Sequence, residues 1–329
     1  SIHFPGCLTG SGRTFFVAAF LSLAMAACEP SAKWVQVRSD LSYPESPVVS
    51  ENRLFFVEYS AHRIASISLT GKDHRIVFQE DGCGPAAFAF LVGGQAVVSC
   101  YDANEVLLLD TRNESWKIIA RIGRDRQGNA LEGPNDFAAN DDGGVFFTTS
   151  GKFSPDAEPG GRVYYWRPGS KPPELLRQGL RYANGIAVSE RRLWVSEHFN
   201  NRLLAFPRDR ADGILDGQAI VDLPARNEAP VPGLDGKSMK KYLGPDGLHL
   251  GKEPGKGSEL FVAHFGAGEV LRLKLNQDGY LVQEEAISLP GELHYPTNVT
   301  FHEGSLFVTA LRDAFSPPYE GELLRMELR

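Results

Sequence analysis

Cysteine is scarce in this chain: there are four among 329 residues, and two of them, Cys7 and Cys28, lie near the start. So few cysteines exclude a scaffold built on many disulfides, and no cysteines and histidines stand at the spacing of a zinc site. Basic residues form no run and no stripe with aromatic residues, and the net charge is −7. The electrostatic footprint of a nucleic-acid partner is therefore absent. A small neutral or anionic molecule is the expected partner.

Long apolar runs are also absent, and the apolar run from Phe15 to Ala27 is too short to cross a bilayer as an ordinary helix. Arg13 before it and the small residues that lead to Cys28 predict a secretory signal peptide over residues 1–28. Cys28 resembles the lipidated first residue of a bacterial lipoprotein, whereas Ala24-x-Ala26 also suits ordinary cleavage. The alternative to a signal is a buried N-terminal helix. We expect an exported protein that is periplasmic or lipid-anchored to the cell envelope through Cys28, its one expected membrane contact.

The other two cysteines, Cys83 and Cys100, flank an expected hairpin that turns at Gly93-Gly94. Because a hairpin brings the far ends of its strands together, their backbones are expected to lie close. In an oxidising compartment they would form a disulfide, and two buried free thiols are the alternative.

A short pattern rich in β-branched and aromatic residues recurs six times, which is typical of strands. Its copies begin 42, 49, 48, 67 and 46 residues apart. The copies are Leu54-Phe-Phe-Val-Glu58, Ala96-Val-Val-Ser-Cys100, Val145-Phe-Phe-Thr-Thr149, Leu193-Trp-Val-Ser-Glu197, Leu260-Phe-Val-Ala-His264 and Leu306-Phe-Val-Thr-Ala310. A second strand-like run follows each copy, starting at Arg63, Glu105, Arg162, Arg202, Glu269 and Glu322.

A period of about 40 to 50 residues without a long amphipathic helix is typical of a β-propeller with four strands per blade. The chain is therefore predicted to be all-β, a six-bladed β-propeller in one domain over residues 34–329. Trp34-Val-Gln-Val37 is expected to complete the last blade and close the ring, and an open β-solenoid is the alternative. Prolines and glycines break the period between Pro207 and Gly244, which predicts an insertion loop. Its part from Pro224 to Gly244 is a candidate lid.

Polar residues open the inner strand of most blades. Glu45, Asn135, Asn184 and Asp246 stand at equivalent positions of the repeat, beside proline or glycine. Each motif alone is typical of a turn, but equivalent positions would aim their oxygens at the propeller axis. Two carboxylates and two amide oxygens balance a divalent cation, for which calcium is the first choice. The sequence predicts one such ion in the central channel, and Zn²⁺, Mg²⁺ or Mn²⁺ stay open as alternatives.

Five motifs occur in this order: Glu45-Ser-Pro-Val-Val49, Pro134-Asn135-Asp136, Asn184-Gly185, Pro245-Asp246-Gly247-Leu248 and Pro296-Thr-Asn-Val-Thr-Phe301. In these motifs the chain resembles the SMP-30/gluconolactonase/regucalcin family and, more distantly, diisopropylfluorophosphatase and paraoxonase. The resemblance implies a metal-centred propeller that opens lactones, with Glu45, Asn184 and Asp246 as metal ligands. Asn135 matches a position that ligates directly in some relatives and through water or substrate in others.

Several positions depart from the family pattern. Ser46 and Val49 stand where Glu-Gly-Pro-x-Trp is common, and Thr149-Ser150 replaces the end of Phe-Thr-Asp-Pro. Gly133 stands where the regucalcin branch has an arginine that contacts substrate. We therefore expect a substrate pocket that differs from that of the sugar-lactone enzymes.

The resemblance implies hydrolysis of a cyclic ester, in which the cation polarises the carbonyl and activates water. Asp246 is the candidate general base, and pure ligation is its alternative role. Two other functions stay open. One is a phosphotriesterase- or arylesterase-like hydrolase on the same metal, and the other is a non-catalytic propeller that binds a ligand.

The loops between the second and third strands should rim the mouth of the channel. They contribute aromatic residues with a few polar groups, as a small-molecule pocket requires. The residues expected to contact a lactone or ester substrate are Asn135, Tyr101, His198, His264 and Phe153.

Overall fold

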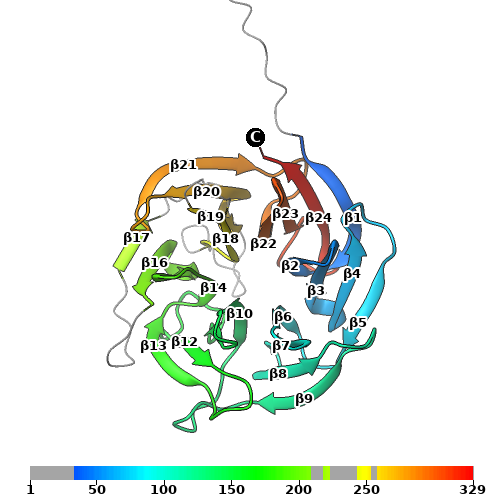
Figure 1. Cartoon of the computed structure of the whole chain (residues 1–329). Helices are drawn as coiled ribbons and strands as arrows, with labels where there is room; N and C mark the ends of the chain where they lie inside the picture. Colours follow the sequence, from blue (N-terminus) through cyan, green and yellow to red (C-terminus); the bar gives the residue numbers. More distant parts are fainter. Residues whose placement is uncertain (1–32, 209–217, 223–242, 253–257, 329) are drawn as a thin grey trace, which may run out of the picture. The chain divides into compact units, whose positions relative to one another are not determined.

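The computed structural model describes residues 33–208, 218–222, 243–252 and 258–328. They form six four-stranded sheets that surround a central axis (Figure 1), and they belong to one compact unit over residues 32–329. The chain is therefore a six-bladed β-propeller, as the repeat predicted. The predicted signal peptide, residues 1–28, and most of the candidate lid lie outside the described residues.

The first three blades follow the chain in order, from the inner strand outward. Blade 1 consists of β2 (Pro44–Ser50), β3 (Arg53–Glu58), β4 (Arg63–Ser68) and β5 (Arg75–Gln79). Blade 2 consists of β6 (Pro85–Leu91), β7 (Gln95–Cys100), β8 (Glu105–Asp110) and β9 (Lys117–Ile122). Blade 3 consists of β10 (Pro134–Ala139), β11 (Val145–Thr149), β12 (Gly161–Trp166) and β13 (Glu174–Leu180).

The other three blades complete the ring. Blade 4 consists of β14 (Ala183–Val188), β15 (Arg192–Glu197), β16 (Arg202–Pro207) and β17 (Gln218–Asp222). Blade 5 consists of β18 (Leu248–Lys252), β19 (Ser258–His264), β20 (Glu269–Leu275) and β21 (Leu281–Ser288). Blade 6 consists of β22 (Tyr295–His302), β23 (Ser305–Leu311), β24 (Glu320–Glu327) and β1 (Val35–Ser42).

Three short 3-10 turns follow second strands: η1 (Tyr59–Ala61), η2 (His198–Asn200) and η3 (Phe265–Ala267). Each ends at a residue in the left-handed conformation, namely His62, Asn201 or Gly268. These turns hold the start of each loop close to the mouth of the channel.

The N-terminal strand closes the ring, because β1 pairs antiparallel with β24 and so forms the outer strand of the last blade. This confirms the predicted role of the run that starts at Trp34 and excludes an open solenoid. The predicted insertion loop between Pro207 and Gly244 needs one correction, since its residues 218–222 form β17, the outer strand of blade 4. The outer strand pairs with β16, so blade 4 is complete.

Apolar side chains fill the space between neighbouring blades. Six hydrophobic clusters each combine residues of two adjacent blades. At the closing interface, for example, Phe56 of blade 1 packs in one cluster with Phe307 of blade 6, and both are almost fully buried. Burying one such side chain stabilises the fold by roughly 1.5 to 3 kcal/mol. The blade interfaces therefore fix the ring and, with it, the inner strands.

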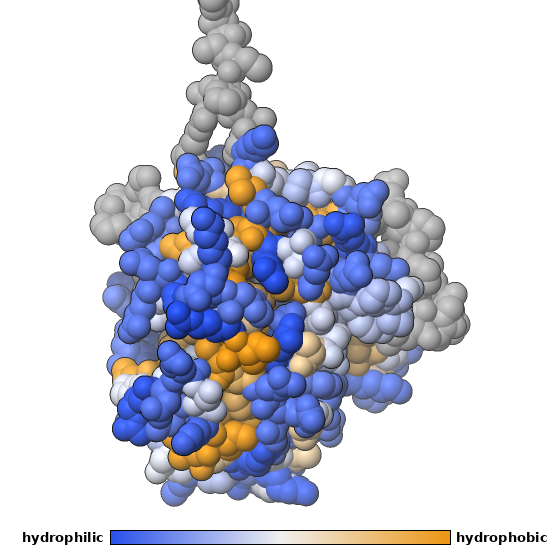
Figure 2. All heavy atoms as spheres, turned by 90° about the vertical axis from the view of Figure 1, so that its right-hand side faces the viewer, coloured by the Kyte–Doolittle hydropathy of each residue, from blue (hydrophilic) through white to orange (hydrophobic). Residues whose placement is uncertain are grey.

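The side of the ring that carries β1 and β5 is mostly hydrophilic, with some apolar side chains among the polar ones (Figure 2). Val35 in β1 and Ile76 in β5 are among the exposed large hydrophobic residues. Among the residues that the structure describes, no helix has the length and apolar character that crossing a membrane requires.

Candidate functional site

A cavity of about 330 Å³ opens at one end of the channel. All four predicted metal ligands line it, and they come from blades 1, 3, 4 and 5. Four of the five predicted substrate contacts, Tyr101, Asn135, Phe153 and His198, line the same cavity. The full lining is Tyr43, Glu45, Tyr59, Ala86, Tyr101, Asn135, Phe153, Tyr182, Asn184, His198, Asp246, Phe265, Ala314, Phe315 and Tyr319.

Irregularities in the inner strands direct the polar residues to the cavity. The pairing of β2 with β3 shifts between Glu45 and Val48, and that of β10 with β11 shifts on either side of Asn135. The pairing of β14 with β15 shifts in the same way around Asn184. A bulge bends its strand and turns a side chain out of the regular alternation. Proline and turn-forming residues thus serve here to place oxygens at the axis.

The glycines that follow two of these residues allow adjacent inner strands to approach closely. A Cβ atom on Gly185 would lie 2.4 Å from the carbonyl oxygen of Asp246, and the Gly185 N–H donates to that oxygen at 3.2 Å. A Cβ atom on Gly247 would lie 2.1 Å from the Asn298 side chain. The Asn-Gly and Asp-Gly motifs therefore meet a packing requirement at the axis, because only glycine fits these contacts.

A hydrogen-bond chain sets the amide of Asn135. The Ser150 hydroxyl donates to the carbonyl oxygen of Ala183 at 2.7 Å, so it accepts a hydrogen bond from Asn135 Nδ2 at 2.9 Å. This assigns the amide nitrogen to Ser150 and leaves the amide oxygen available as an acceptor. Ser150, a departure from the family pattern, thus leaves the amide oxygen of Asn135 as the atom that could bind a cation.

The two cavity carboxylates, buried Asp246 and half-buried Glu45, have no cationic partner among the described residues of the cavity lining. Burial, together with the charges of Asp246 and Asp136, raises the pKa of Glu45 well above its usual range. Burial and the charge of Asp136 do the same to the pKa of Asp246. No lysine or arginine is among the described residues that line the cavity. A divalent cation would supply the missing positive charge, so the donor set fits such an ion.

The amide oxygens are necessary parts of this set. Within the described part of the chain, no three His, Cys, Asp or Glu side chains lie together in a way that would hold a metal ion. Asn135 and Asn184 would therefore have to complete any coordination by Glu45 and Asp246. Oxygen-only donors with neutral amides suit calcium better than zinc.

Asp136 belongs to the scaffold around the site. It is buried, and its carboxylate accepts hydrogen bonds from the backbone N–H groups of Phe137 at 2.9 Å and Ile186 at 3.2 Å. Burial raises its pKa to about 7, although these two bonds act in the opposite direction. Asp136 lines a second cavity, on the other side of the proposed ligands, which we call the opposite cavity. Its hydrogen bond to Ile186 links blade 3 to blade 4.

His198 is buried in the wall of the cavity and is a neutral hydrogen-bond acceptor. Its Nδ1 lies 3.1 Å from the carbonyl oxygen of Pro245, which can only accept, so Nδ1 carries the proton. Its Nε2 has no hydrogen-bond partner among the described residues. Burial lowers the pKa of His198 to about 4, and its ring packs against Phe199 and Phe265 at centroid distances of 5.0 and 5.6 Å.

His264 lies outside the lining of the cavity, unlike the other predicted substrate contacts. Its Nε2 is 3.0 Å from Asn201 Oδ1 and its Nδ1 is 3.3 Å from Glu269 Oε1. Successive residues of a strand point to opposite faces, and His264 occupies the last position of the repeated pattern. The residue after it, Phe265, lines the cavity instead, as Tyr59, Tyr101 and His198 do in other blades. The expected contact is thus displaced by one residue.

Several aromatic residues of the cavity wall are not among the predicted substrate contacts. Tyr43 and Tyr182 each stand two residues before a candidate ligand, and both have a left-handed backbone, with φ of 53° and 60°. Gly133 takes the same conformation, with φ of 61°, at the equivalent place in blade 3. The recurrence of a tyrosine at this repeat position could have predicted that Tyr43 and Tyr182 line the cavity. Tyr319 and Phe315, from the loop before β24, had no such signal.

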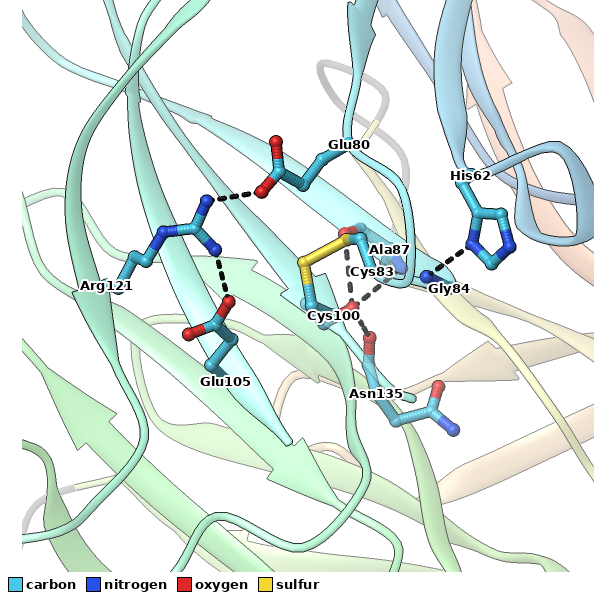
Figure 3. The surroundings of a disulfide bond; sticks show 10 residues. His62, Glu80, Cys83, Gly84, Ala87, Cys100, Glu105, Arg121 and Asn135 are labelled. Carbon is cyan, nitrogen blue, oxygen red and sulfur yellow. Dashed lines mark hydrogen bonds and ion pairs between the residues drawn. A yellow bond between two sulfur atoms is a disulfide. The ribbon is translucent and has the colours of Figure 1, made fainter. Parts of the chain in front are cut away.

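The disulfide predicted as one alternative is present beside this wall. The structure joins Cys83, before β6, to Cys100, at the end of β7 (Figure 3). The next residue, Tyr101, lines the cavity, and its N–H donates to the carbonyl oxygen of Gly84 at 3.0 Å. Figure 3 shows the backbone oxygen of Asn135 close to the same pair, held by a hydrogen bond of 2.6 Å from the Ser99 hydroxyl. The disulfide therefore braces two residues of the site.

The chain is a six-bladed propeller with carboxylate and amide side chains at one end of its channel. It belongs to the SMP-30/Gluconolactonase/LRE-like family, whose model matches residues 43–312. The match covers all six blades apart from the closing strands β1 and β24. The resemblance seen in the sequence motifs is thereby confirmed.

Proteins with related sequences carry a lactonase name. The chain is 25% identical to "Lactonase drp35" of Staphylococcus haemolyticus over 293 residues, which are 86% of this chain and 81% of that protein. It is 28% identical to the protein of the same name from Staphylococcus epidermidis, over 73% of this chain and 67% of the relative.

Solved structures support the fold. A luciferin-regenerating enzyme superposes with a TM-score of 0.67 at 18% identity, covering 90% of this chain and 95% of its own. A gluconolactonase from Xanthomonas campestris gives 0.66 at 19% identity, with 91% and 90% covered. A calcium-binding regucalcin from Agrobacterium tumefaciens gives 0.64 at 17% identity, with 91% and 96% covered. At these identities the likeness concerns the propeller alone.

Proposed function

We propose that the protein is a metal-dependent lactonase that binds one divalent cation, calcium by preference, through Glu45, Asn135, Asn184 and Asp246. The main observation is that two carboxylates and two amides line one cavity whose described lining has no cationic side chain. The family and the lactonase-named relatives point to the same chemistry. The cation, when bound, would act as a Lewis acid on an ester carbonyl.

The chain's own residues would bind and orient the substrate. The wall formed by Tyr101, Phe153, Tyr182 and Phe265 offers apolar ring faces to an uncharged lactone and keeps water away from its far side. Asp246 faces the same space and is the candidate to accept a proton from the attacking water. His198, neutral and unprotonated at Nε2, stands beside it as an acceptor.

A substrate screen on metal-stripped and reloaded protein tests the proposal. Aldonolactones, aliphatic lactones and aryl phosphotriesters would be compared before and after treatment with a chelator, and the bound metal would be identified by elemental analysis. We expect turnover of a lactone that is lost on stripping and restored by calcium. Faster turnover of phosphotriesters would favour the phosphotriesterase-like alternative, because the aromatic wall of the cavity also suits a neutral triester.

Asp246→Asn tests the carboxylate that is both the candidate general base and a proposed metal ligand. We expect a loss of kcat/KM of at least about 10³-fold, in the range found when an essential catalytic group is removed. Asp156→Asn, at an exposed carboxylate on the loop that carries Phe153, is the matched control and should keep full activity. A wild-type protein that binds calcium but turns over nothing in the screen would indicate a non-catalytic propeller.

We also propose that the protein is exported. The segment before residue 28 has the pattern of a signal peptide, and the Cys83–Cys100 disulfide suits an oxidising compartment. Cell fractionation of the wild type and of Cys28→Ser tests both forms of export. A lipid anchor predicts that the wild type sediments with membranes and that the variant does not.

A further inference from the structure

A hydroxyl recurs at the fourth position of the repeated strand pattern in only some blades. Ser99, Thr148 and Ser196 occupy it in blades 2, 3 and 4, and all three are buried. Blades 1 and 5 have Val57 and Ala263 there. Strand propensity alone does not account for this distribution, because valine suits these positions at least as well.

Each of these hydroxyls donates a hydrogen bond into the next blade. Ser99 Oγ donates to the backbone oxygen of Asn135 at 2.6 Å. Thr148 Oγ1 donates to that of Asn184 at 2.5 Å, and Ser196 Oγ to that of Asp246 at 2.7 Å. The three acceptors are three of the four proposed metal ligands.

Two of these hydroxyls, those of Ser99 and Thr148, are also anchored in their own blade, in the gap that the bulge leaves. Ser99 Oγ accepts the N–H of Ala87 at 2.8 Å, and Thr148 Oγ1 accepts the N–H of Asp136 at 3.1 Å. With both a donor and an acceptor engaged, the hydroxyl cannot rotate freely. It therefore fixes the backbone of the ligand residue in the next blade relative to its own blade.

The hydroxyl is missing where the next blade carries no proposed ligand. Val57 precedes blade 2, whose cavity residue is Ala86, and Ala263 precedes blade 6, where Asn298 lines the opposite cavity. Hydroxyls that only joined blades would be expected at these two interfaces as well. The pattern follows the ligands and not the interfaces.

Blade 6 reaches the fourth ligand by a relay. Thr309 Oγ1 lies 2.8 Å from Thr297 Oγ1, and the Thr297 hydroxyl donates to the backbone oxygen of Pro44 at 2.7 Å. Pro44 directly precedes Glu45. The relay adds one hydroxyl but ends beside a ligand, as the direct bonds do.

We propose that Ser99, Thr148 and Ser196 are positioning residues, whose hydroxyls hold the backbone of Asn135, Asn184 and Asp246 at the spacing that a divalent cation requires. This inference rests on the proposed metal site. It adds that part of the affinity for the ion is set by side chains that never touch it. Groups that orient metal ligands typically affect metal affinity by about 10- to 100-fold.

Two adjacent, isosteric substitutions provide the test. Thr148→Val removes the hydroxyl that bonds to Asn184, and Thr149→Val removes a buried hydroxyl that has no hydrogen-bond partner among the described residues. The calcium dissociation constant would be measured by titration calorimetry on metal-stripped protein, together with the unfolding temperature of the metal-free form. We expect Thr148→Val to weaken calcium binding about tenfold and Thr149→Val to leave it unchanged. Thr148→Ser should restore wild-type affinity.

Equal calcium affinity in Thr148→Val and the wild type would overturn the inference, even if the variant were less stable. An equal loss in both valine variants would also overturn it, since packing would then be the cause. Ser99→Ala, which acts on Asn135, repeats the test should Thr148→Val fail to fold. Failure of the proposed function would be visible already in the wild type, as absence of calcium binding.

Discussion

The hydroxyl of Tyr182 donates a hydrogen bond of 3.0 Å to the hydroxyl of Tyr101, which lies 81 residues earlier in the chain. The Tyr101 hydroxyl in turn donates a hydrogen bond to the backbone oxygen of Gly151 at 3.3 Å. Blade 2, blade 4 and the loop after β11 are thereby joined along the wall of the cavity. The aromatic wall is thus held by a polar chain as well as by ring packing.

Tyr101→Phe breaks this chain while it keeps the ring. We expect the free energy of unfolding to fall by about 1 kcal/mol, the typical net contribution of a buried hydrogen bond. KM for a lactone substrate should rise more than kcat falls, because the wall binds the substrate and does not perform the reaction. Urea unfolding and steady-state kinetics measure both effects. Tyr280→Phe, at an exposed tyrosine, should change neither.

Glu45→Gln should stabilise the metal-free protein. The substitution keeps the shape of the side chain and removes one of the two like charges of the cavity, which repel each other in the absence of a cation. At pH 8 the metal-free variant should therefore unfold at a higher temperature than metal-free wild type. Calcium should raise the unfolding temperature of the wild type but not that of the variant. A lower unfolding temperature of the metal-free variant would contradict the account of the site.

His249, in the opposite cavity, should make stability depend on pH. Burial lowers its pKa to about 4 from 6.5. Above pH 6.5 the imidazole is neutral in both states, so it has no effect there. As the pH falls from 6.5 to 4, the unfolded chain binds a proton that the folded chain does not bind, and stability is lost. The full loss is about 3 kcal/mol.

Urea unfolding of wild type and His249→Gln between pH 7.5 and about 4 measures this loss. The free energy of unfolding should decline less steeply with acid in the variant. His198 is shifted in the same direction and remains in both proteins, so part of the decline should persist. Parallel curves would show that His249 is not responsible.

His198→Phe should affect substrate binding, whereas His264→Phe should affect the stability of the fold. His198 lines the cavity, and its loss should raise KM for a substrate with a hydrogen-bond donor about tenfold, the equivalent of one hydrogen bond. His264 lies outside the lining and bonds to Asn201 and Glu269, so its loss should reduce the free energy of unfolding by about 2 kcal/mol. Thermal unfolding and kinetics on both variants give the comparison. A larger effect on KM from His264→Phe would reverse the assignment.

Gly133→Arg should not create the sugar-binding arginine of the regucalcin branch. Gly133 has a left-handed backbone with φ of 61°, and a Cβ atom there would lie 2.9 Å from the Tyr101 ring. We expect the variant to lose roughly 1 to 3 kcal/mol of stability, because the backbone is strained and Tyr101 must move. Gly133→Ala separates the backbone strain from the size of the arginine. Activity on an aldonolactone that rises in Gly133→Arg without a loss of stability would contradict this view.

Most of the fold could be predicted from the repeat in the sequence. Strand alternation and a period near 48 residues between copies such as Val145 and Leu193 require only local information, because each blade has the same pattern. Ring closure through β1 was also readable, since the N-terminal run was left over after six blades. Equivalent repeat positions likewise brought Glu45, Asn135, Asn184 and Asp246 to one cavity.

Only the tertiary structure decided which neighbours complete the site. His264 and Phe265 are adjacent in sequence, but His264 ends β19 and Phe265 begins the turn η3, and it is the ring of Phe265, not that of His264, that reaches the cavity. Tyr319 and Phe315 join the wall from a loop whose path no local pattern fixes. The bonds from Ser99, Thr148 and Ser196 cross from one blade to the next. Local sequence sets the period and direction of a strand, whereas contacts between blades depend on how the closed ring packs.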